Sequence, residues 1–250
     1  MENYFDFTDK TIEVGGVILH QIVLIRDTCF GKQGDFGGYI ENLENLSGDA
    51  WVSGNARVSG NARVYGNARV YGNAQVYGNA QVYGNARVSG NARVSGDAQV
   101  SGDAWVSGNA RVSGNARVSG DAQVYCNARV SGDARVYGNA RVSGDAQVSG
   151  YAWVYCNARV SGNARVSGDA QVSGDAQVSG NAQVNEITDF IVFKNNWSSG
   201  RYFTWTKSNN MWLVGCFYGT GEELVKKAYK DSDISGKNYE LYVELVKKIA

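Results

Sequence analysis

The sequence predicts a parallel β-solenoid, a fold in which short strands coil into a rod. Three observations predict it. Twenty-three hexapeptides follow one another over residues 47–184 without insertion or deletion, glycine or cysteine returns at every sixth position, and valine closes each unit. A short repeat of fixed period is typical of solenoids, in which each unit packs only on its neighbours.

Each hexapeptide has the pattern of a short strand followed by a corner. Ala56 and Val58 lie two residues apart, so both point to the same side of an extended strand. Gly60 accepts a positive φ and Asn61 can bond its own backbone, so this pair ends the strand. A helix is excluded, because glycine at every sixth position would cost about 1 kcal/mol each time. We therefore expect alanine and valine inside the coil.

This unit resembles the hexapeptide repeat of left-handed parallel β-helices, in which a small residue precedes an aliphatic one by two places. The resemblance implies a left-handed, triangular coil of three hexapeptides, and the repeats then make nearly eight coils. The same spacing extends beyond the perfect block, to Ile40 on one side and Phe190 on the other.

Different sequence flanks the repeats, as expected for a rod whose open ends would otherwise recruit other chains. Residues 11–26 are predicted to form a hairpin around Gly15-Gly16. The predicted units are an N-terminal β-hairpin cap, the hexapeptide-repeat β-helix and an α+β C-terminal domain, with the ranges 1–39, 40–190 and 191–250.

The C-terminal domain should contain strands followed by two helices. The strands are expected at residues 187–194, 201–207 and 211–218. Thr220 and Glu223 have the spacing of a capping box at the start of the first helix. Its expected apolar face consists of Leu224, Val225, Ala228 and Tyr229. The second helix should run from about residue 237 to 249, with an inner face made of Tyr242, Val243, Val246 and Ile249.

The two flanks resemble those of a family of phage and prophage hexapeptide-repeat proteins. The resemblance covers nearly the whole chain and is carried by three stretches: Gly34-Asp35-Phe36-Gly37-Gly38-Tyr39-Ile40-Glu41, Asn45-Leu46-Ser47, and Cys216-Phe217-Tyr218-Gly219-Thr220 with the helices after it. It implies a phage-encoded protein of the host cytoplasm and transfers no catalytic activity.

Composition indicates a soluble, cytoplasmic protein. The chain has 24 basic and 24 acidic residues, and the repeats hold twelve arginines against eight aspartates. This net charge of +4 is too small to indicate nucleic acid as the favoured partner. No run of eighteen apolar residues exists, and Met1-Glu2-Asn3-Tyr4 does not open a signal peptide. We expect no membrane contact.

The four cysteines are expected to be free thiols. Cys126 and Cys156 each replace a corner glycine, and they lie thirty residues apart. Since thirty is not a multiple of the eighteen-residue coil, the two should occupy different corners, too far apart for a disulfide.

The sequence argues against an enzyme. Catalytic left-handed β-helices typically use a histidine base with a loop thrown out of a coil, or three histidines on a metal. This chain has one histidine, His20, in an apolar strand before the repeats, and no loop interrupts the repeats. We expect His20 to be a packed or edge residue, and we predict no catalytic residue, no metal site and no cofactor.

Residues eighteen apart should stack on successive coils, about 4.8 Å apart. The outward position between alanine and valine then forms three rows, which begin at Trp51, Arg57 and Arg63. Most tyrosines that follow valine flank the third row, where they should form the stacked pairs Tyr65/Tyr83 and Tyr137/Tyr155.

The third row is the predicted contact surface. Arg135 should lie one coil from Trp153, and arginine with tryptophan and tyrosine is typical of interface hot spots. The alternative is that these residues are ladders that only stabilise the coils. The predicted binding residues are Arg63, Tyr65, Tyr83, Arg117, Arg135, Tyr137, Trp153 and Tyr155.

Several functions stay open at this point. The first hypothesis is a non-enzymatic protein-interaction module, which the phage resemblance would make an inhibitor of a host defence protein. Others are binding of nucleic acid or a phosphate ligand through the arginine rows, and a structural spacer or phage particle component. An acyltransferase-like enzyme with its site between subunits is the weakest. A homo-oligomer through a solenoid face or the C-terminal domain is compatible with each.

Overall fold

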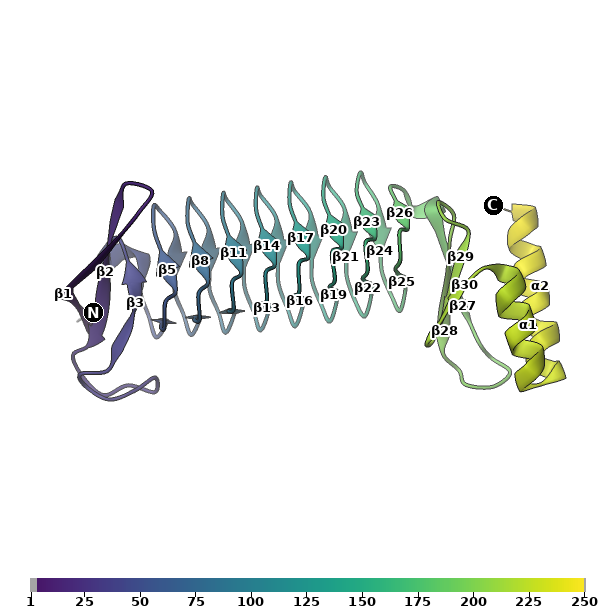
Figure 1. The fold of residues 1–250 in the computed structure, drawn as a ribbon, viewed down its shortest axis with the longest axis horizontal. Helices are drawn as coiled ribbons and strands as arrows, with labels where there is room; N and C mark the ends of the chain where they lie inside the picture. The colour runs from purple at the N-terminus through teal and green to yellow at the C-terminus, as the bar shows by residue number, and fades with distance from the viewer. Residues whose placement is uncertain (1–3, 250) are drawn as a thin grey trace.

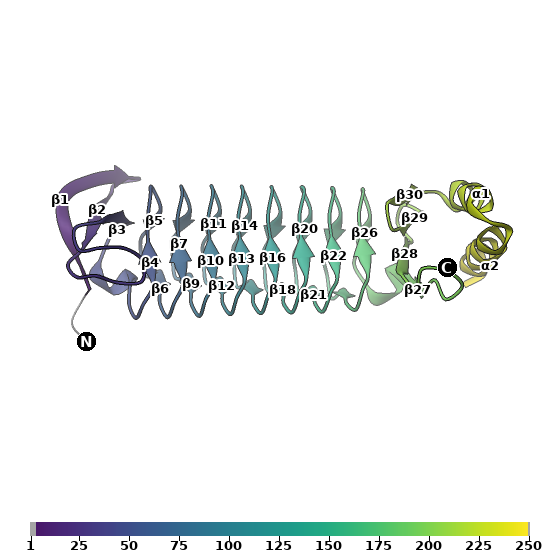
Figure 2. The same ribbon diagram turned by 90° about the horizontal axis from the view of Figure 1, so that it is seen from below.

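The structure is a computed structural model that describes residues 4–249. The hexapeptides coil into a straight rod with a β cap at one end and an α+β unit at the other (Figure 1, Figure 2). Strand pairing joins residues eighteen apart, such as Trp51 and Arg69. The predicted β-solenoid with three hexapeptides per coil is therefore confirmed.

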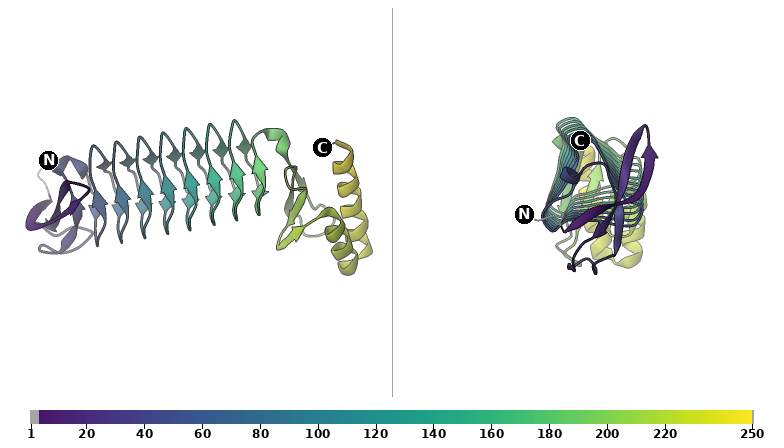
Figure 3. Two further views of the ribbon diagram at one scale, coloured as in Figure 1. Left: turned by 45° about the horizontal axis from the view of Figure 1, so that its top comes forward. Right: turned by 90° about the vertical axis from the view of Figure 1, so that its left-hand side faces the viewer.

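Each hexapeptide contributes one two-residue strand, from β4 (Trp51–Val52) to β26 (Gln183–Val184), with a new strand every six residues. The strands stack into three parallel ladders, so successive coils superpose when the rod is viewed along its axis (Figure 3, right). We call them the first face (β4 to β25, Gln177–Val178), the second face (β5, Arg57–Val58, to β26) and the third face (β6, Arg63–Val64, to β24, Gln171–Val172).

The coil interior consists of the repeat alanines and valines, and none of them is exposed. Corner glycines provide the turns. Gly144, for example, has a φ of 67°, and a Cβ there would lie 2.9 Å from backbone atoms of Gly162 on the next coil. Cys126 and Cys156 adopt the same left-handed conformation, with φ of 60° and 58°.

The corner asparagines differ from expectation. Instead of bonding their own backbone, their side-chain amides donate to the residue at the same corner one coil further along. Asn55, for example, donates to Asn73, which in turn donates to Asn91. The stacking distance favours this because it brings successive amides within hydrogen-bond range, and the corners therefore form ladders of their own.

The N-terminal cap extends the second face. Strands β1 (Phe5–Val14) and β2 (Val17–Leu24) form the predicted hairpin, and β3 (Phe36–Ile40) pairs with β2 on one side and with β5 on the other. A 3₁₀ turn, η1 (Leu43–Asn45), then leads into the coils.

The caps satisfy backbone groups at both open ends of the solenoid. At the start, the Tyr4 hydroxyl donates to the carbonyl of Ala50, and the Asn45 amide donates to two carbonyls of the following coil, those of Gly60 and Ala62. At the finish, the Thr204 hydroxyl accepts the Gln177 N–H at 2.9 Å and the Ser208 hydroxyl accepts the Gln183 N–H at 2.7 Å.

The C-terminal unit begins with η2 (Ile187–Asp189), a 3₁₀ turn, where a strand was predicted. A four-stranded antiparallel sheet follows, made of β27 (Phe190–Lys194), β28 (Tyr202–Thr206), β29 (Met211–Val214) and β30 (Phe217–Gly219). The prediction of a single strand over 211–218 is wrong, because Gly215, with φ of 59°, turns the chain between β29 and β30.

Two helices cover this sheet, α1 (Gly221–Asp231) and α2 (Asp233–Ile249). The predicted capping box is present, with the Thr220 N–H donating to Oε2 of Glu223 at 2.8 Å. The apolar faces of both helices were predicted only in part. In α2, Val243 and Val246 are buried but Ile249 is 59% exposed. In α1, Tyr229 is 39% exposed. No helix within residues 4–249 is long and apolar enough to span a bilayer.

Candidate interaction face

The predicted tyrosine pairs are stacked on the third face. The rings of Tyr137 and Tyr155 lie 5.0 Å apart and are inclined by 4°, and those of Tyr65 and Tyr83 lie 4.9 Å apart at the same angle. The stacking follows from the coil period, because each tyrosine directly follows a strand that pairs with the strand eighteen residues later.

Arg135 and Trp153 form the centre of a larger group. The guanidinium carbon of Arg135 lies 5.0 Å from the centre of the Trp153 ring, and Tyr137 meets the same ring edge-on at 6.3 Å. Arg117 lies on the preceding coil, paired with Arg135. We call this group the Arg135 cluster; its members are Arg117, Arg135, Tyr137, Trp153 and Tyr155.

The other predicted residues form a separate group nearer the N-terminus. The guanidinium carbon of Arg63 lies 6.0 Å from the centre of the Tyr65 ring, and the Tyr65 hydroxyl donates to Oε1 of Gln81 at 3.2 Å. Serines at positions 101 and 119 interrupt the tyrosine column between the two groups. Tyr83 and Tyr137 are three coils apart, about 14 Å. All eight residues share one face, but they do not form one continuous patch.

The outward row of the third face carries three arginines, Arg63, Arg117 and Arg135. Arg135 and Arg117 are exposed. Within residues 4–249, the only ion pair joins Lys32 and Asp27, so no described corner aspartate forms a direct ion pair with an arginine of the outward rows. Partial burial, with the neighbouring Tyr155 ring, raises the pKa of Tyr137, while Arg135 opposes the shift. Tyr137 is therefore a neutral phenol at physiological pH, beside the arginine side chains of the cluster.

Sequence reasoning missed a second aromatic site, on the first face. Phe30, from the loop between β2 and β3, stacks on Trp51 with ring centres 6.1 Å apart, and Arg69 lies over Phe30 at 5.2 Å. These residues border a cavity of about 590 Å³. The only signal in the sequence was the bulky Trp51 at the head of its row, since the path of the loop depends on contacts distant in sequence.

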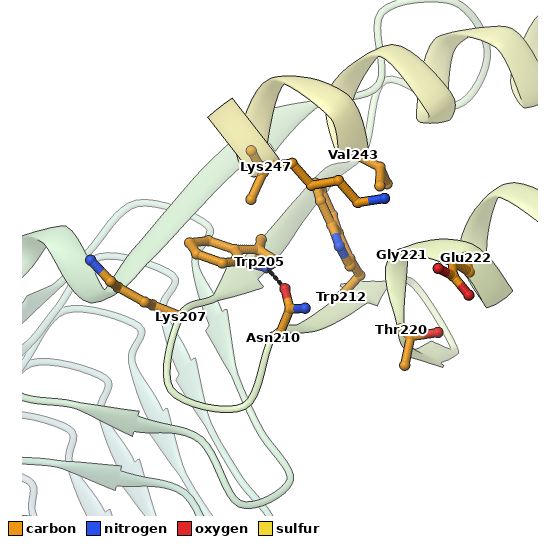
Figure 4. Close-up of a pocket in the computed structure, with 10 residues that line it drawn as sticks. Trp205, Lys207, Asn210, Trp212, Thr220, Gly221, Glu222, Val243 and Lys247 are labelled. Atoms are coloured by element: carbon orange, nitrogen blue, oxygen red, sulfur yellow. Dashed lines mark hydrogen bonds between the residues drawn. The ribbon is translucent and has the colours of Figure 1, made fainter. Parts of the chain in front are cut away.

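A cleft in the C-terminal unit lies between the sheet and α2 (Figure 4). It has a volume of about 520 Å³, with Trp205 and Trp212 at its floor and Lys207 and Lys247 at its rim. The Trp205 indole donates to Oδ1 of Asn210 at 2.9 Å. Both tryptophans are almost fully buried, so they belong to the core and offer no open stacking surface.

The residues with reactive side chains are dispersed. His20 is half-buried and its ring packs on Phe7 at 4.8 Å. All four cysteines are unpaired and exposed. No three His, Cys, Asp or Glu side chains come together as metal ligands in the described part of the chain.

Comparison with known families identifies the solenoid. Residues 9–152, more than half of the chain, match the bactofilins, described as polymer-forming and cytoskeletal. The chain belongs to the bactofilin family. Residues 158–174 also match the β-solenoid repeat of YdcK. No curated protein matches the chain. The bactofilin match includes most of the N-terminal hairpin and most coils, and it agrees with a structural, non-enzymatic class of protein.

Proposed function

We propose that this protein is a non-enzymatic structural rod that assembles with other copies through the Arg135 cluster. The observation that carries the proposal is the closure of both solenoid ends by the chain's own caps. At one end the Tyr4 hydroxyl donates a hydrogen bond to the Ala50 carbonyl, and at the other the Thr204 hydroxyl accepts one from the Gln177 N–H. A rod closed in this way does not grow by adding coils, so assembly uses its sides or its caps.

The open sheet edge at β1 is unsuited to pairing with a strand of another chain. The centre of this strand is a run of four polar residues, 8–11, that includes the charged Asp9 and Lys10, and its pairing with β2 is irregular between Phe7 and Thr11. Charges and irregularities on an edge strand disfavour addition of a further strand. The side faces are therefore better candidates for contact than this edge.

The Arg135 cluster has the strongest hot-spot chemistry of the side faces. Trp153 is half-buried and contacts both Arg135 and the Tyr137 ring of the preceding coil, so its orientation is restricted before any partner arrives. Large aromatic side chains that are already ordered bind with little further loss of entropy. Apart from the group of Arg63, Tyr65 and Tyr83, the rest of the third face offers serine and glutamine.

The test is the assembly state of the full chain. Arg135→Ala with Trp153→Ala should reduce assembly, measured by sedimentation velocity and negative-stain microscopy. Arg129→Ala with Gln147→Ala is the matched control, because these residues are paired on successive coils of the second face. Unchanged assembly in the first double variant, with both proteins folded by circular dichroism, would overturn the site.

A second candidate is favoured by one observation, the absence of ion pairs along the arginine rows within residues 4–249. Rows of unneutralised arginine can bind nucleic acid or another polyanion. Affinity would then fall steeply between 50 and about 200 mM salt. A flat salt response with a labelled oligonucleotide would eliminate this function.

The narrower hypothesis of a phage-encoded inhibitor of a host protein rests on the resemblance of the flanks alone. Such an inhibitor would use the same Arg135 cluster. Capture of one stoichiometric host protein by the wild type, and loss of it in the Arg135→Ala, Trp153→Ala variant, would support it.

A further inference from the structure

Helix α2 has apolar side chains on two opposite faces. Its inner face packs Tyr239, Val243 and Val246 into the core of the C-terminal unit. Four large apolar residues elsewhere on the helix remain exposed: Ile234 (64%), Leu241 (64%), Leu245 (42%) and Ile249 (59%). A helix with two apolar faces usually buries both, but the described part of the chain provides no partner for the outer face.

The exposed residues have the spacing of a helix-pairing seam. Ile234, Asn238, Leu241 and Leu245 follow one another at intervals of four, three and four residues, as a and d positions do in a coiled coil. The half-buried Asn238 is the single polar residue in this seam. Together with α1, the helix forms the outermost layer of the C-terminal end (Figure 1, Figure 3), so nothing in residues 4–249 covers its outer face.

The charges beside the seam identify a second copy of the same helix as the partner. Lys237 and Glu244 lie on one flank, one heptad apart, at equivalent positions. In an antiparallel pair, residues on this flank face the same flank of the other helix. When Ile234 packs against Leu245 of the second copy, Lys237 lies opposite Glu244 of the second copy. By symmetry, this lysine–glutamate pair occurs twice in the dimer.

A parallel arrangement does not achieve this. There, Lys237 would face the position of Tyr242 and Glu244 that of Ile249, so neither charge would find an opposite charge. Charge complementarity therefore selects the antiparallel pair. In this pair Asn238 lies opposite Leu241, and its side-chain amide is already bonded to the Ile234 carbonyl of its own helix at 2.8 Å.

We propose that the outer stripe of α2 pairs antiparallel with the same stripe of a second copy and joins two rods at their C-terminal ends. This inference rests on the proposed function, self-assembly, but uses a different surface. The contact is isologous and closes at a dimer. Combined with the Arg135 cluster on the rod's side, it would give an assembly with two independent contacts.

The experiment measures dimerisation of the full chain by sedimentation equilibrium, in a background carrying Arg135→Ala with Trp153→Ala so that side contacts are removed. Leu241→Lys should raise the dissociation constant at least about tenfold, because the leucine enters the symmetric seam twice. Lys237→Glu should also weaken the dimer, and Lys237→Glu combined with Glu244→Lys should restore it. Lys226→Glu, the same charge change on exposed α1, is the control and should have no effect.

The outcomes separate the two proposals. Loss of dimer in Leu241→Lys with an unchanged helical spectrum, plus rescue by the charge swap, supports α2 pairing. A dimer that is insensitive to Leu241→Lys overturns α2 pairing. A background variant that is monomeric at all concentrations also overturns it. In the second case, assembly of the unaltered chain through the Arg135 cluster would remain supported. If Leu241→Lys reduces only binding to anionic phospholipid vesicles and not dimerisation, the stripe is a membrane contact and the inference is also wrong.

Discussion

The side-chain amide of Asn79 donates a 2.9 Å hydrogen bond to Oδ1 of Asp97, the residue at the same corner one coil further along. Every asparagine–aspartate contact along these corners has this direction, because a carboxylate accepts hydrogen bonds and has no proton to donate at neutral pH. The ladder of side-chain hydrogen bonds along each corner therefore continues at an asparagine, which can donate to the next coil, and stops at an aspartate, which cannot.

Reversing this order should cost stability. Asn79→Asp removes the donor and places two carboxylates one coil apart, and we expect a loss of about 1 kcal/mol in the free energy of unfolding. The loss should shrink at acidic pH, as the carboxyl groups take up protons. Asp97→Asn is the matched control: it keeps an acceptor for Asn79 and adds a donor towards Asn115. Urea denaturation at pH 7 and pH 4 measures both, and equal effects of the two substitutions would contradict the explanation.

Backbone conformation at the corners gives a second prediction. Cys126 holds a φ of 60° that favours glycine, so Cys126→Gly should stabilise the rod by about 1 kcal/mol. Gly144→Ala should destabilise it by more than that, because the added Cβ is strained and also lies 2.9 Å from the Gly162 backbone. Thermal unfolding of both variants provides the measurement, and a stabilising Gly144→Ala would disprove the steric argument.

The regular coils and their corners could be predicted from the sequence alone. The eighteen-residue period fixed the coil, the three rows and the ring stacking of Tyr137 on Tyr155, because each is a direct consequence of register. Features outside the period were missed. The loop that brings Phe30 onto Trp51, and the turn at Gly215, depend on contacts between segments that have no repeat. The outward direction of Ile249 was also mispredicted, since α2 has two apolar faces and its sequence does not say which one the core takes.

Closure of the C-terminal end of the solenoid gives a third prediction. Thr204→Val preserves shape but removes the oxygen that accepts the Gln177 N–H at 2.9 Å. Leaving this donor unpaired should cost about 1–3 kcal/mol, and the Gln177 amide should exchange its hydrogen faster by mass spectrometry. Thr188→Val, at an exposed position, is the control with the same chemical change. Equal exchange in both variants would mean that Thr204 does not close this end.

The N-terminal closure depends on a protonated tyrosine. Burial, with smaller contributions from Asp49 and Cys29, raises the pKa of the Tyr4 hydroxyl above its ordinary value of 10.0. The folded chain therefore holds a proton that the unfolded chain releases near pH 10. The stability from this group is complete below that pH and is lost as the pH rises above it, towards the folded-state pKa.

Tyr4→Phe isolates this contribution. At pH 8 the variant should be less stable than the wild type by about 1 kcal/mol, because the Ala50 carbonyl loses its donor. Above pH 10 the wild type should lose stability faster than the variant, since only the unfolded wild type has a tyrosine at position 4 that releases its proton while the folded chain retains it. The other tyrosines are the same in both proteins, so the difference between the urea midpoints of the wild type and the variant at pH 8 and pH 11 reports on Tyr4. A constant difference across this range would show that Tyr4 does not stay protonated against Ala50.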